Sequence, residues 1–309
     1  MQEKLRHVIE AQQFTREWIE NWLFPLAGEM ERLARWGEAK TLMGKRMITF
    51  FYEPSTRTRA SFEIAMNLLG GDVVFSTENA EKFSSAAKDE SLRDTVRVLN
   101  RYHPNVIVMR FKNDGEAAIA ASVSAAPVIN AGDGSGQHPT QALLDLYTIY
   151  KRFGRIDGLS IAVVGDLLHG RTVRSLSYLL GKFSDVRIYF ISPGSLSIRD
   201  DIKGYLVRHG VLFTETENLR WAVPNVDVIY QTRIQKERGS VLAPEDAARF
   251  HISGELVSIM KQDSIIMHPL PRNEEIALEV DNDPRAVYLT DQVSAGLYVR
   301  MALLTMILA

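Results

Sequence analysis

The feature that most constrains the fold of this 309-residue chain is an alternation between short apolar runs and helix-length amphipathic segments. Nine runs have the length and apolar content of strands, at residues 47–51, 72–75, 106–109, 128–129, 160–164, 186–191, 211–214, 226–230 and 264–267. Segments with apolar residues three and four positions apart lie between most of them, for example at 59–69, 141–153 and 172–183. This alternation predicts βαβ units, and continuous apolar strands are typical of parallel sheets that helices cover on both faces.

The positions of the runs predict two such domains. Four runs precede Ala131, five begin at Ser160, and a glycine-rich loop followed by a long helix lies between the two groups. A chain of this length has room for two hydrophobic cores. We therefore expect an α/β fold with two doubly wound parallel-sheet domains, residues 1–153 and 154–291, and a C-terminal helix at 292–309 that crosses back to complete the first domain.

Composition excludes several classes of function. The chain has 36 Lys and Arg against 38 Asp and Glu, so its formal charge is −2 and nucleic acid is not expected as a partner. It has no cysteine, which excludes disulfides, thiolate zinc sites, iron–sulfur clusters and a cysteine nucleophile. Residues 1–13 are too charged for a signal peptide, and the apolar stretch 301–309 is too short to span a bilayer. We expect a cytoplasmic protein that does not bind membranes.

Because ligands of open α/β sheets bind beyond the carboxyl ends of the strands, the residues after each run are the first candidates for a functional site. After the first run, Pro54 ends the strand. Ser55 or Thr56 is then placed to cap a helix, whose unpaired backbone amides, together with Arg57, favour a phosphate or carboxylate. The alternative is a capped helix with solvated arginines.

Two more polar residues follow strands in the first half of the chain. Arg110 comes at the end of a buried run, where it either points into a cleft or forms a salt bridge at the rim. His138 follows a stretch of glycines that lets the backbone approach a ligand, and Pro139 forces it out of helical geometry. The sequence leaves both a catalytic and a structural role open for this histidine.

The second half repeats the pattern. Arg171 opens a helix after a strand, although the surrounding G-x-x-x-x-G spacing matches neither the Rossmann fingerprint nor a P-loop. Arg233 and Gln235 alternate in extended chain and so are expected to face one side, and the Lys-Glu-Arg that follows indicates a solvated face. Two prolines flank Leu270, and we expect the bond before Pro271 to be cis.

Arginines thus recur at strand or helix ends in both halves of a chain with almost no net charge. Such a concentration of cationic groups predicts a small, multiply anionic ligand. The four residues are Arg57, Arg110, Arg171 and Arg233. No paired-carboxylate, Ser-His-Asp or metal-ligand arrangement stands out.

Three ordered motifs give the chain a close resemblance to the aspartate/ornithine carbamoyltransferase family, namely STRTR at 55–59, HPTQ at 138–141 and HPLPR at 268–272. GDLLHGRTV, TRIQKER and the proline of HPLPR are similar to the aspartate branch, whereas ornithine enzymes typically place cysteine in that last motif. The resemblance, which runs from about Met47 to the C-terminus, implies transfer of the carbamoyl group of carbamoyl phosphate to the α-amino group of L-aspartate. This reaction is an early step of pyrimidine biosynthesis and needs no cofactor or metal.

The resemblance also implies a role for each candidate residue. The residues implied to hold carbamoyl phosphate are Ser55, Thr56, Arg57, Thr58, Arg110, His138 and Gln141, with the backbone carbonyls of Pro269 and Leu270. Those implied to be catalytic, because they bind the phosphate or stabilise charge on the carbamoyl oxygen, are Arg57, Thr58, Arg110 and His138. Those implied to bind aspartate are Lys88, Arg171, Arg233 and Gln235.

Residues 83–94 resemble the mobile loop of this family that enters a neighbouring subunit's active site, with Ser84 and Lys88 at the matching positions. Ala87 stands where lysine is common, and Asp89 stands where glycine is common, which adds a negative charge and removes backbone freedom. The resemblance implies a homotrimer with shared active sites; the alternative is a solvated flexible loop. The QKER stretch is similar to that of catalytic chains that pair with a separate regulatory chain.

Three other functions remain open from the sequence. A carbamoyltransferase for ornithine or another amine is the first, although Arg233 and Gln235 suit a dicarboxylate better than a cationic side chain. A non-catalytic scaffold or effector-binding module is the second, and it is disfavoured because every expected ligand position carries a competent residue. A dinucleotide-dependent oxidoreductase fits the fold but lacks the glycine fingerprint.

Overall fold

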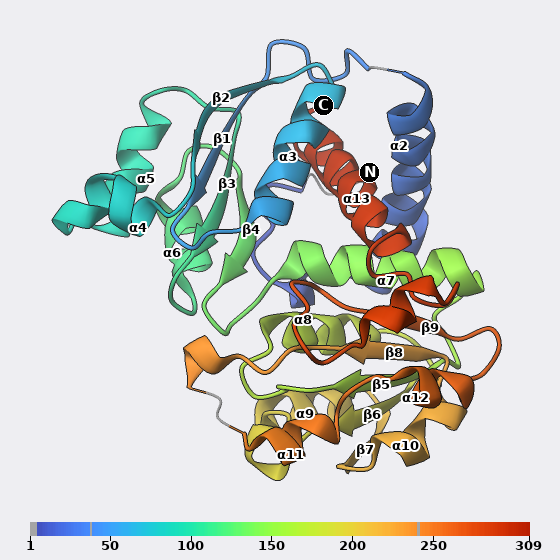
Figure 1. The fold of residues 1–309 in the computed structure, drawn as a ribbon. Coiled ribbons are helices and arrows are strands. Elements are labelled where there is room, and N and C mark those ends of the chain that lie inside the picture. Colours follow the sequence, from blue (N-terminus) through green and yellow to red (C-terminus); the bar gives the residue numbers. More distant parts are fainter. Residues whose placement is uncertain (1–4, 38, 240–241) are drawn as a thin grey trace. The chain divides into compact units, whose positions relative to one another are not determined.

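The computed structural model describes residues 5–37, 39–239 and 242–309, which divide into two compact units. The first unit comprises Met1–Leu144 and Ser294–Ala309, and the second comprises Asp145–Val293. All nine predicted runs form strands, and every strand pair is parallel (Figure 1). The predicted class, α/β with two parallel sheets, is therefore confirmed.

The first unit is built on a four-stranded sheet in the order β2-β1-β3-β4. Its strands are β1 (Arg46–Phe51), β2 (Asp72–Thr77), β3 (Val106–Phe111) and β4 (Val128–Asp133). Successive side chains of a strand point to opposite faces, so each face acquires its own core. On one face, Ile48 and Phe50 pack in a cluster with residues of α5 (Leu92–Asn100) and α6 (Glu116–Val123).

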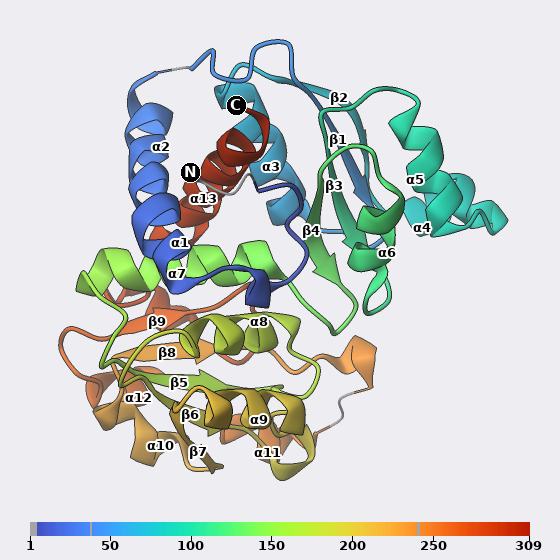
Figure 2. The same cartoon turned by 180° about the vertical axis from the view of Figure 1, so that it is seen from behind.

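Helices α3 (Thr56–Leu68) and α13 (Asp291–Leu308) lie side by side on the other side of this sheet (Figure 2). Arg300 of α13 joins them, since its Nη1 donates a hydrogen bond to Ser61 Oγ at 2.6 Å. Its guanidinium also stacks over the ring of Phe62, 5.1 Å from the centroid. The end of the chain thus completes the core of the first unit, as the sequence predicted.

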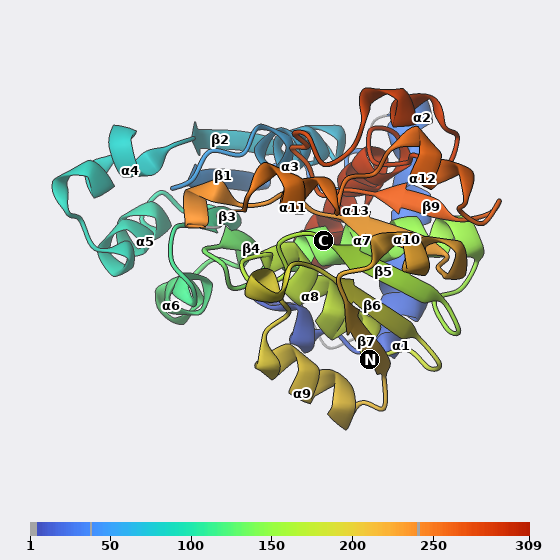
Figure 3. The same ribbon diagram turned by 60° about the horizontal axis from the view of Figure 1, so that its bottom comes forward.

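The second unit holds a five-stranded sheet in the order β7-β6-β5-β8-β9. Its strands are β5 (Ser160–Val164), β6 (Arg187–Ile191), β7 (Leu212–Thr216), β8 (Val228–Gln231) and β9 (Ile265–Met267). Figure 3 shows α8 (Arg171–Leu180) and α9 (Asp200–Arg208) on one face, and α10 (Leu219–Ala222) and α12 (Gly254–Ser258) on the other. Strands of this kind, buried between two helical layers, require the continuous apolar runs found in the sequence.

Two strands depart from the predicted burial on both faces. In β2, Val74 and Phe75 expose 48% and 46% of their surface, and β7 exposes most of its residues, including Leu212. Both are edge strands, which have a neighbour on one side only. The apolar runs predicted the strands correctly, but apolar character alone does not distinguish an edge strand from a central one.

Helix α7 (Pro139–Phe153) and helix α13 each belong to both units. One boundary between the units falls between Leu144 and Asp145 inside α7, and the other falls between Val293 and Ser294 inside α13. The sequence analysis placed a boundary near Phe153, where α7 ends. Because the helix continues across the boundary, the sequence there does not have the composition of a linker, and the boundary cannot be recognised from it.

The described chain also forms several shorter helices and helix α2, some of which add residues to these cores, as Ala80, Val223 and Val280 do. These helices are η1 (Ala11–Gln13), α1 (Arg16–Trp18), η2 (Ile19–Leu23), α2 (Phe24–Trp36), α4 (Ala80–Phe83), η3 (Ser85–Lys88), η4 (Gly194–Leu196), η5 (Val223–Asn225), η6 (Lys236–Arg238), α11 (Pro244–Ala248) and η7 (Leu278–Asn282). None of the helices in the described part of the chain is long and apolar enough to cross a membrane.

Candidate active site

The first candidate region is the topological switch point of the four-stranded sheet. From β1 the chain moves to one neighbour, β2, and then returns to the other, β3, so the carboxyl ends of β1 and β3 flank the crevice where such sheets bind ligands. The Tyr52 N–H donates a hydrogen bond to the Arg110 carbonyl at 2.9 Å, and Arg110 Nη2 lies 3.4 Å from Glu53 Oε2. These contacts fix the exit of β1 against the end of β3.

The N-terminus of α3 begins at this crevice. Ser55 is the N-cap residue, as the sequence allowed, but its side chain makes no capping hydrogen bond. Its own N–H donates instead to Glu78 Oε1 at 2.6 Å. The first-turn amides of a helix have no partner within the helix, so the amides of Thr56 to Thr58 stay available for an anion.

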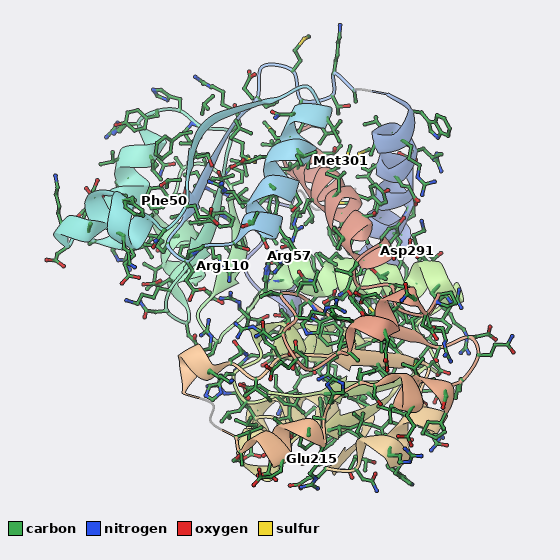
Figure 4. All side chains as sticks on the ribbon, viewed as in Figure 1. Phe50, Arg57, Arg110, Glu215, Asp291 and Met301 are labelled. Carbon is green, nitrogen blue, oxygen red and sulfur yellow. The ribbon has the colours of Figure 1, made fainter. Side chains whose placement is uncertain are left out.

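Arg57 is the cationic group at this helix start. Its side chain is exposed, and no carboxylate within the described residues pairs with it, whereas Arg59 of the same helix lies 3.5 Å from Glu78 and 3.9 Å from Glu63. Partial desolvation of the guanidinium lowers the pKa of Arg57. Figure 4 shows Arg57 at the start of α3 and Arg110 at the end of β3. Thr58, by contrast, is buried.

Arg110 combines the two alternatives left open by the sequence. It forms the salt bridge with Glu53, and its Nη1 donates to the Ala131 carbonyl at 3.3 Å, yet it does so at the switch point and with only 13% of its side chain exposed. An arginine held from both sides in this way is a preorganised charge at the carboxyl end of the sheet.

His138 and Gln141 lie where β4 leads into α7. Both are buried, and His138 Nδ1 lies 3.5 Å from Thr140 Oγ1. The Gln141 N–H donates to the His138 carbonyl at 3.1 Å, which holds the two residues in the first turn of the helix. The structure thus brings His138 and Gln141 to the carboxyl end of β4, next to β3.

Asp133 is a buried residue of this region that the sequence analysis did not single out. Its carboxylate accepts the Gln137 N–H at 2.6 Å and the Gly115 N–H at 3.1 Å. Burial nevertheless raises its pKa to about 6, because the backbone donors offset only part of the desolvation. Asp133 closes the turn before His138, and an Asp in a Gly-rich stretch is the signal that could have identified it.

The segment around Ser84 and Lys88 forms a short, ordered turn. Ser84 Oγ accepts the Ala86 N–H at 3.1 Å and donates to the Ala80 carbonyl at 2.6 Å. Lys88 is exposed and has no ion-pair partner in the described chain. Asp89 adopts φ +62°, the left-handed region that glycine favours and aspartate tolerates, so the substitution noted in the sequence fits the local backbone.

The second candidate region is the switch point of the five-stranded sheet, between β5 and β8. Gly165 leaves β5 with φ +114°, and a Cβ there would lie 2.3 Å from the Thr232 carbonyl oxygen at the end of β8. Only glycine permits this close approach of the two chain segments.

Asp166, which the sequence analysis passed over, joins the loops that leave these two strands. It is fully buried and accepts the His169 N–H at 3.0 Å and the Gln235 N–H at 3.2 Å. The first loop leads to Arg171, the first residue of α8, and the second carries Arg233 and Gln235, all three partly buried. The structure therefore brings three of the four predicted aspartate ligands to adjacent strand ends of one sheet, while the fourth, Lys88, lies in the first unit.

The HPLPR segment follows β9, the neighbour of β8. The Leu270–Pro271 bond is cis, as predicted, and Leu270 has φ +56°. His268 Nδ1 accepts the Leu270 N–H at 2.7 Å, and Nε2 lies 2.8 Å from Glu275 Oε1. Burial alone would raise the pKa of Glu275, but its hydrogen bonds, chiefly from His268, outweigh that effect and lower it.

The described residues, 5–37, 39–239 and 242–309, contain no group of three or more His, Asp and Glu side chains placed to hold a metal ion. The polar groups gathered at the strand ends are instead arginines, hydroxyls, amides and backbone N–H groups. These groups bind and orient anions.

Comparison with known proteins defines the class. Residues 6–151 match the carbamoyl-P binding domain of aspartate/ornithine carbamoyltransferase, and residues 157–307 match its Asp/Orn binding domain. The chain belongs to the aspartate/ornithine carbamoyltransferase family.

Similar proteins fall in the aspartate branch of that family. Over 309 residues the chain is 52% identical to a chloroplastic aspartate carbamoyltransferase of Arabidopsis thaliana, covering 99% of this chain and 78% of the relative. A structure of aspartate transcarbamoylase from Trypanosoma cruzi with carbamoyl aspartate and phosphate is 37% identical, with a TM-score of 0.89. The match covers 98% of this chain and 96% of the Trypanosoma cruzi chain. The catalytic subunit of Methanocaldococcus jannaschii aspartate transcarbamoylase is 45% identical, with a TM-score of 0.88 and 98% of both chains covered.

Proposed function

We propose that this chain transfers the carbamoyl group of carbamoyl phosphate to the α-amino group of L-aspartate, giving N-carbamoyl-L-aspartate and phosphate. The observation that carries the proposal is the 52% identity to an aspartate carbamoyltransferase over nearly the whole chain. The anion-binding groups at the strand ends of both sheets support it, as does the relative that holds carbamoyl aspartate and phosphate. In a cell the product would enter pyrimidine synthesis.

The first unit supplies the ligands for carbamoyl phosphate. The phosphate binds at the N-terminus of α3, where the helix amides and the Arg57 guanidinium provide donors and positive charge. Thr58, Arg110 and His138 donate to the carbamoyl oxygen, and Gln141 orients the carbamoyl amino group. His138 acts as a hydrogen-bond donor rather than as a base.

The second unit supplies the ligands for aspartate. Arg171, Arg233 and Gln235 bind its two carboxylates, and the carbonyls of Pro269 and Leu270 accept the carbamoyl N–H groups. Ornithine would instead need a carboxylate for its cationic side chain. Asp166, which lies between the two arginine loops, is fully buried and holds backbone N–H groups, so it does not serve that purpose.

The reaction then follows from orientation and charge. The neutral amine of aspartate attacks the carbamoyl carbon, a tetrahedral oxyanion forms against the donors of the first unit, and the bond from carbon to the phosphate oxygen breaks. The departing phosphate accepts the proton that the amine loses. Holding two reactants in line and stabilising one developing charge are the effects this arrangement contributes.

A homotrimer with shared active sites is the assembly we propose. Its support is Lys88, exposed and without an ion-pair partner in the described chain, on a segment whose Phe83 is 77% exposed. Mixing inactive Lys88→Ala and Arg57→Ala chains should restore part of the activity, because some sites would then receive both native residues. A mixture that exchanges subunits and stays inactive would contradict shared sites. The M. jannaschii relative is named a catalytic subunit, which supports a separate regulatory chain as a further partner.

The direct test is carbamoyl transfer by the purified chain, with aspartate and ornithine offered in parallel. We expect carbamoyl aspartate and no citrulline. Product from ornithine alone would contradict the role given to Arg233 and Gln235. Absence of both products from folded protein would contradict the proposed activity of the chain by itself.

A further inference from the structure

Four buried residues next to or within the HPLPR segment are joined by a series of hydrogen bonds, and none of the four is a predicted ligand. Tyr230 of β8, which is fully buried, donates its hydroxyl to Asp145 Oδ2 at 2.7 Å. Gln292 Nε2 donates to the other oxygen, Asp145 Oδ1, at 2.7 Å. Gln292 Oε1 then accepts the backbone N–H of His268 at 2.9 Å. All four residues are nine-tenths or more buried and belong to the second unit.

The donor and the acceptor of each hydrogen bond in this series are fixed by the chemistry of the groups. A carboxylate accepts only, so the side of the Gln292 amide that faces Asp145 must be its NH₂ group. Its carbonyl is thereby turned toward His268, where it meets a donor. Had the amide been reversed, its NH₂ would oppose the His268 N–H, and two buried donors would face each other.

His268 is held from a second side by its ring. Nδ1 accepts the Leu270 N–H at 2.7 Å, so this nitrogen carries no proton, and Nε2–H donates to Glu275 Oε1 at 2.8 Å. Backbone and ring of one residue are thus both fixed, by Gln292 and by Glu275. The two following residues, Pro269 and Leu270, are the ones whose carbonyls bind the carbamoyl amino group in the proposed function.

We propose that Asp145 and Gln292 are positioning residues that set the Pro269 and Leu270 carbonyls at the angle required to select the carbamoyl amino group. The inference rests on the proposed function and deepens it, because it names what holds the selective carbonyls in place. The same carboxylate also accepts a hydrogen bond from the hydroxyl of Tyr230 in β8, and from the end of this strand the chain leads to Arg233 and Gln235. Asp145 is therefore linked both to the loop that recognises the amino group and to the strand that leads to two residues assigned to aspartate.

Acetyl phosphate provides the readout, because it carries a methyl group where carbamoyl phosphate carries the amino group and keeps the same phosphate. The measured quantity is the ratio of the inhibition constant of acetyl phosphate to the KM of carbamoyl phosphate. Gln292→Met keeps the side-chain volume and removes both hydrogen bonds. We expect it to lower the ratio about tenfold, through the KM of carbamoyl phosphate, since a misaligned hydrogen bond costs about 1 to 1.5 kcal/mol.

Two further variants separate positioning from stability. Tyr205→Phe removes another buried hydrogen bond of the second unit, from the hydroxyl to the Tyr178 carbonyl at 3.1 Å, and should leave the ratio unchanged. The double variant D145N/Q292E exchanges the amide and the carboxylate between the two positions. It restores a donor facing an acceptor, leaves an acceptor for the His268 N–H, and should keep the ratio of the wild type even if Gln292→Met does not fold.

The outcomes test the positioning role separately from the proposed carbamoyl-transfer activity. A ratio unchanged in Gln292→Met, with a loss of thermal stability like that of Tyr205→Phe, would overturn the positioning role. A folded D145N/Q292E chain with a ratio of inhibition constant to KM far below that of the wild type would also overturn the positioning role. A wild-type chain that forms no carbamoyl aspartate would overturn the proposed function itself, and the acetyl phosphate comparison would not be needed to show it.

Discussion

Replacing Arg57 by alanine should separate the loss of ligand binding from any loss of folding stability. Within the described residues its guanidinium pairs with no carboxylate, and desolvation lowers its pKa without an opposing charge. Its removal should therefore change the free energy of unfolding by less than about 0.5 kcal/mol. The phosphate would lose about two charge-assisted hydrogen bonds at about 1.5 to 3 kcal/mol each, a loss of about 10² to 10⁴ in kcat/KM for carbamoyl phosphate.

Arg59→Ala is the matched control, two residues further along the same helix. Arg59 lies 3.5 Å from Glu78 and 3.9 Å from Glu63, so its loss should reduce stability by up to about 1 kcal/mol and leave the phosphate site in place. Steady-state kinetics with varied carbamoyl phosphate, combined with urea unfolding of both variants, makes the comparison. An Arg57→Ala chain with near-normal kcat/KM, or one that loses activity only because it unfolds, would refute the assignment of the phosphate site.

Three other changes test separate parts of the reasoning. Arg233→Ala should raise the KM for aspartate about a hundredfold and that for carbamoyl phosphate far less, and equal increases in kinetic assays would contradict its assignment to aspartate. Burial raises the pKa of Asp133 to about 6, so its carboxyl stabilises the fold below about pH 4 and loses that contribution as the pH rises through 6. The difference in the free energy of unfolding between the wild type and Asp133→Asn, measured with urea, should therefore be roughly 1 to 2 kcal/mol more in favour of the wild type at pH 5 than at pH 7.5. A difference that does not change with pH would show that burial does not control the pKa of Asp133. Gly165→Ala places a Cβ 2.3 Å from the Thr232 carbonyl at φ +114° and should lower the thermal midpoint by about 8 °C or more, whereas Gly154→Ala, with open space around it at φ +69°, should cost less.

What the sequence revealed followed from local periodicity. Runs such as 160–164 must be apolar because helices cover both faces of the central strands, and that requirement is visible residue by residue. The cap residue Ser55 marked the start of α3, but the start of α7 was less visible, because this helix already begins at Pro139, before the apolar spacing sets in. A cap or a proline at the first position starts the helix there, and neither contributes to the periodic pattern.

The supporting residues of the site could not be found in this way. Asp145 meets Tyr230 and Gln292 across 85 and 147 residues of sequence, so neither pairing is visible as a local pattern. Buried polar groups are specified by partners that the fold brings together, so no local pattern marks them. Asp166 and Glu275 escaped for the same reason, although both lie within or beside motifs that the sequence analysis quoted.

The division of α13 between the two units affects the order in which the chain folds during its synthesis. The second unit is one continuous stretch, Asp145–Val293, and can close its sheet as soon as that stretch has left the ribosome. The first unit waits for Ser294–Ala309, whose Met301 and Leu303 fill its core, although most of its own residues emerged first. Until then the sheet face beneath α13 stays uncovered. A pause late in translation should therefore expose the earlier-made half of the molecule to proteases and chaperones, while the later-made half is already protected.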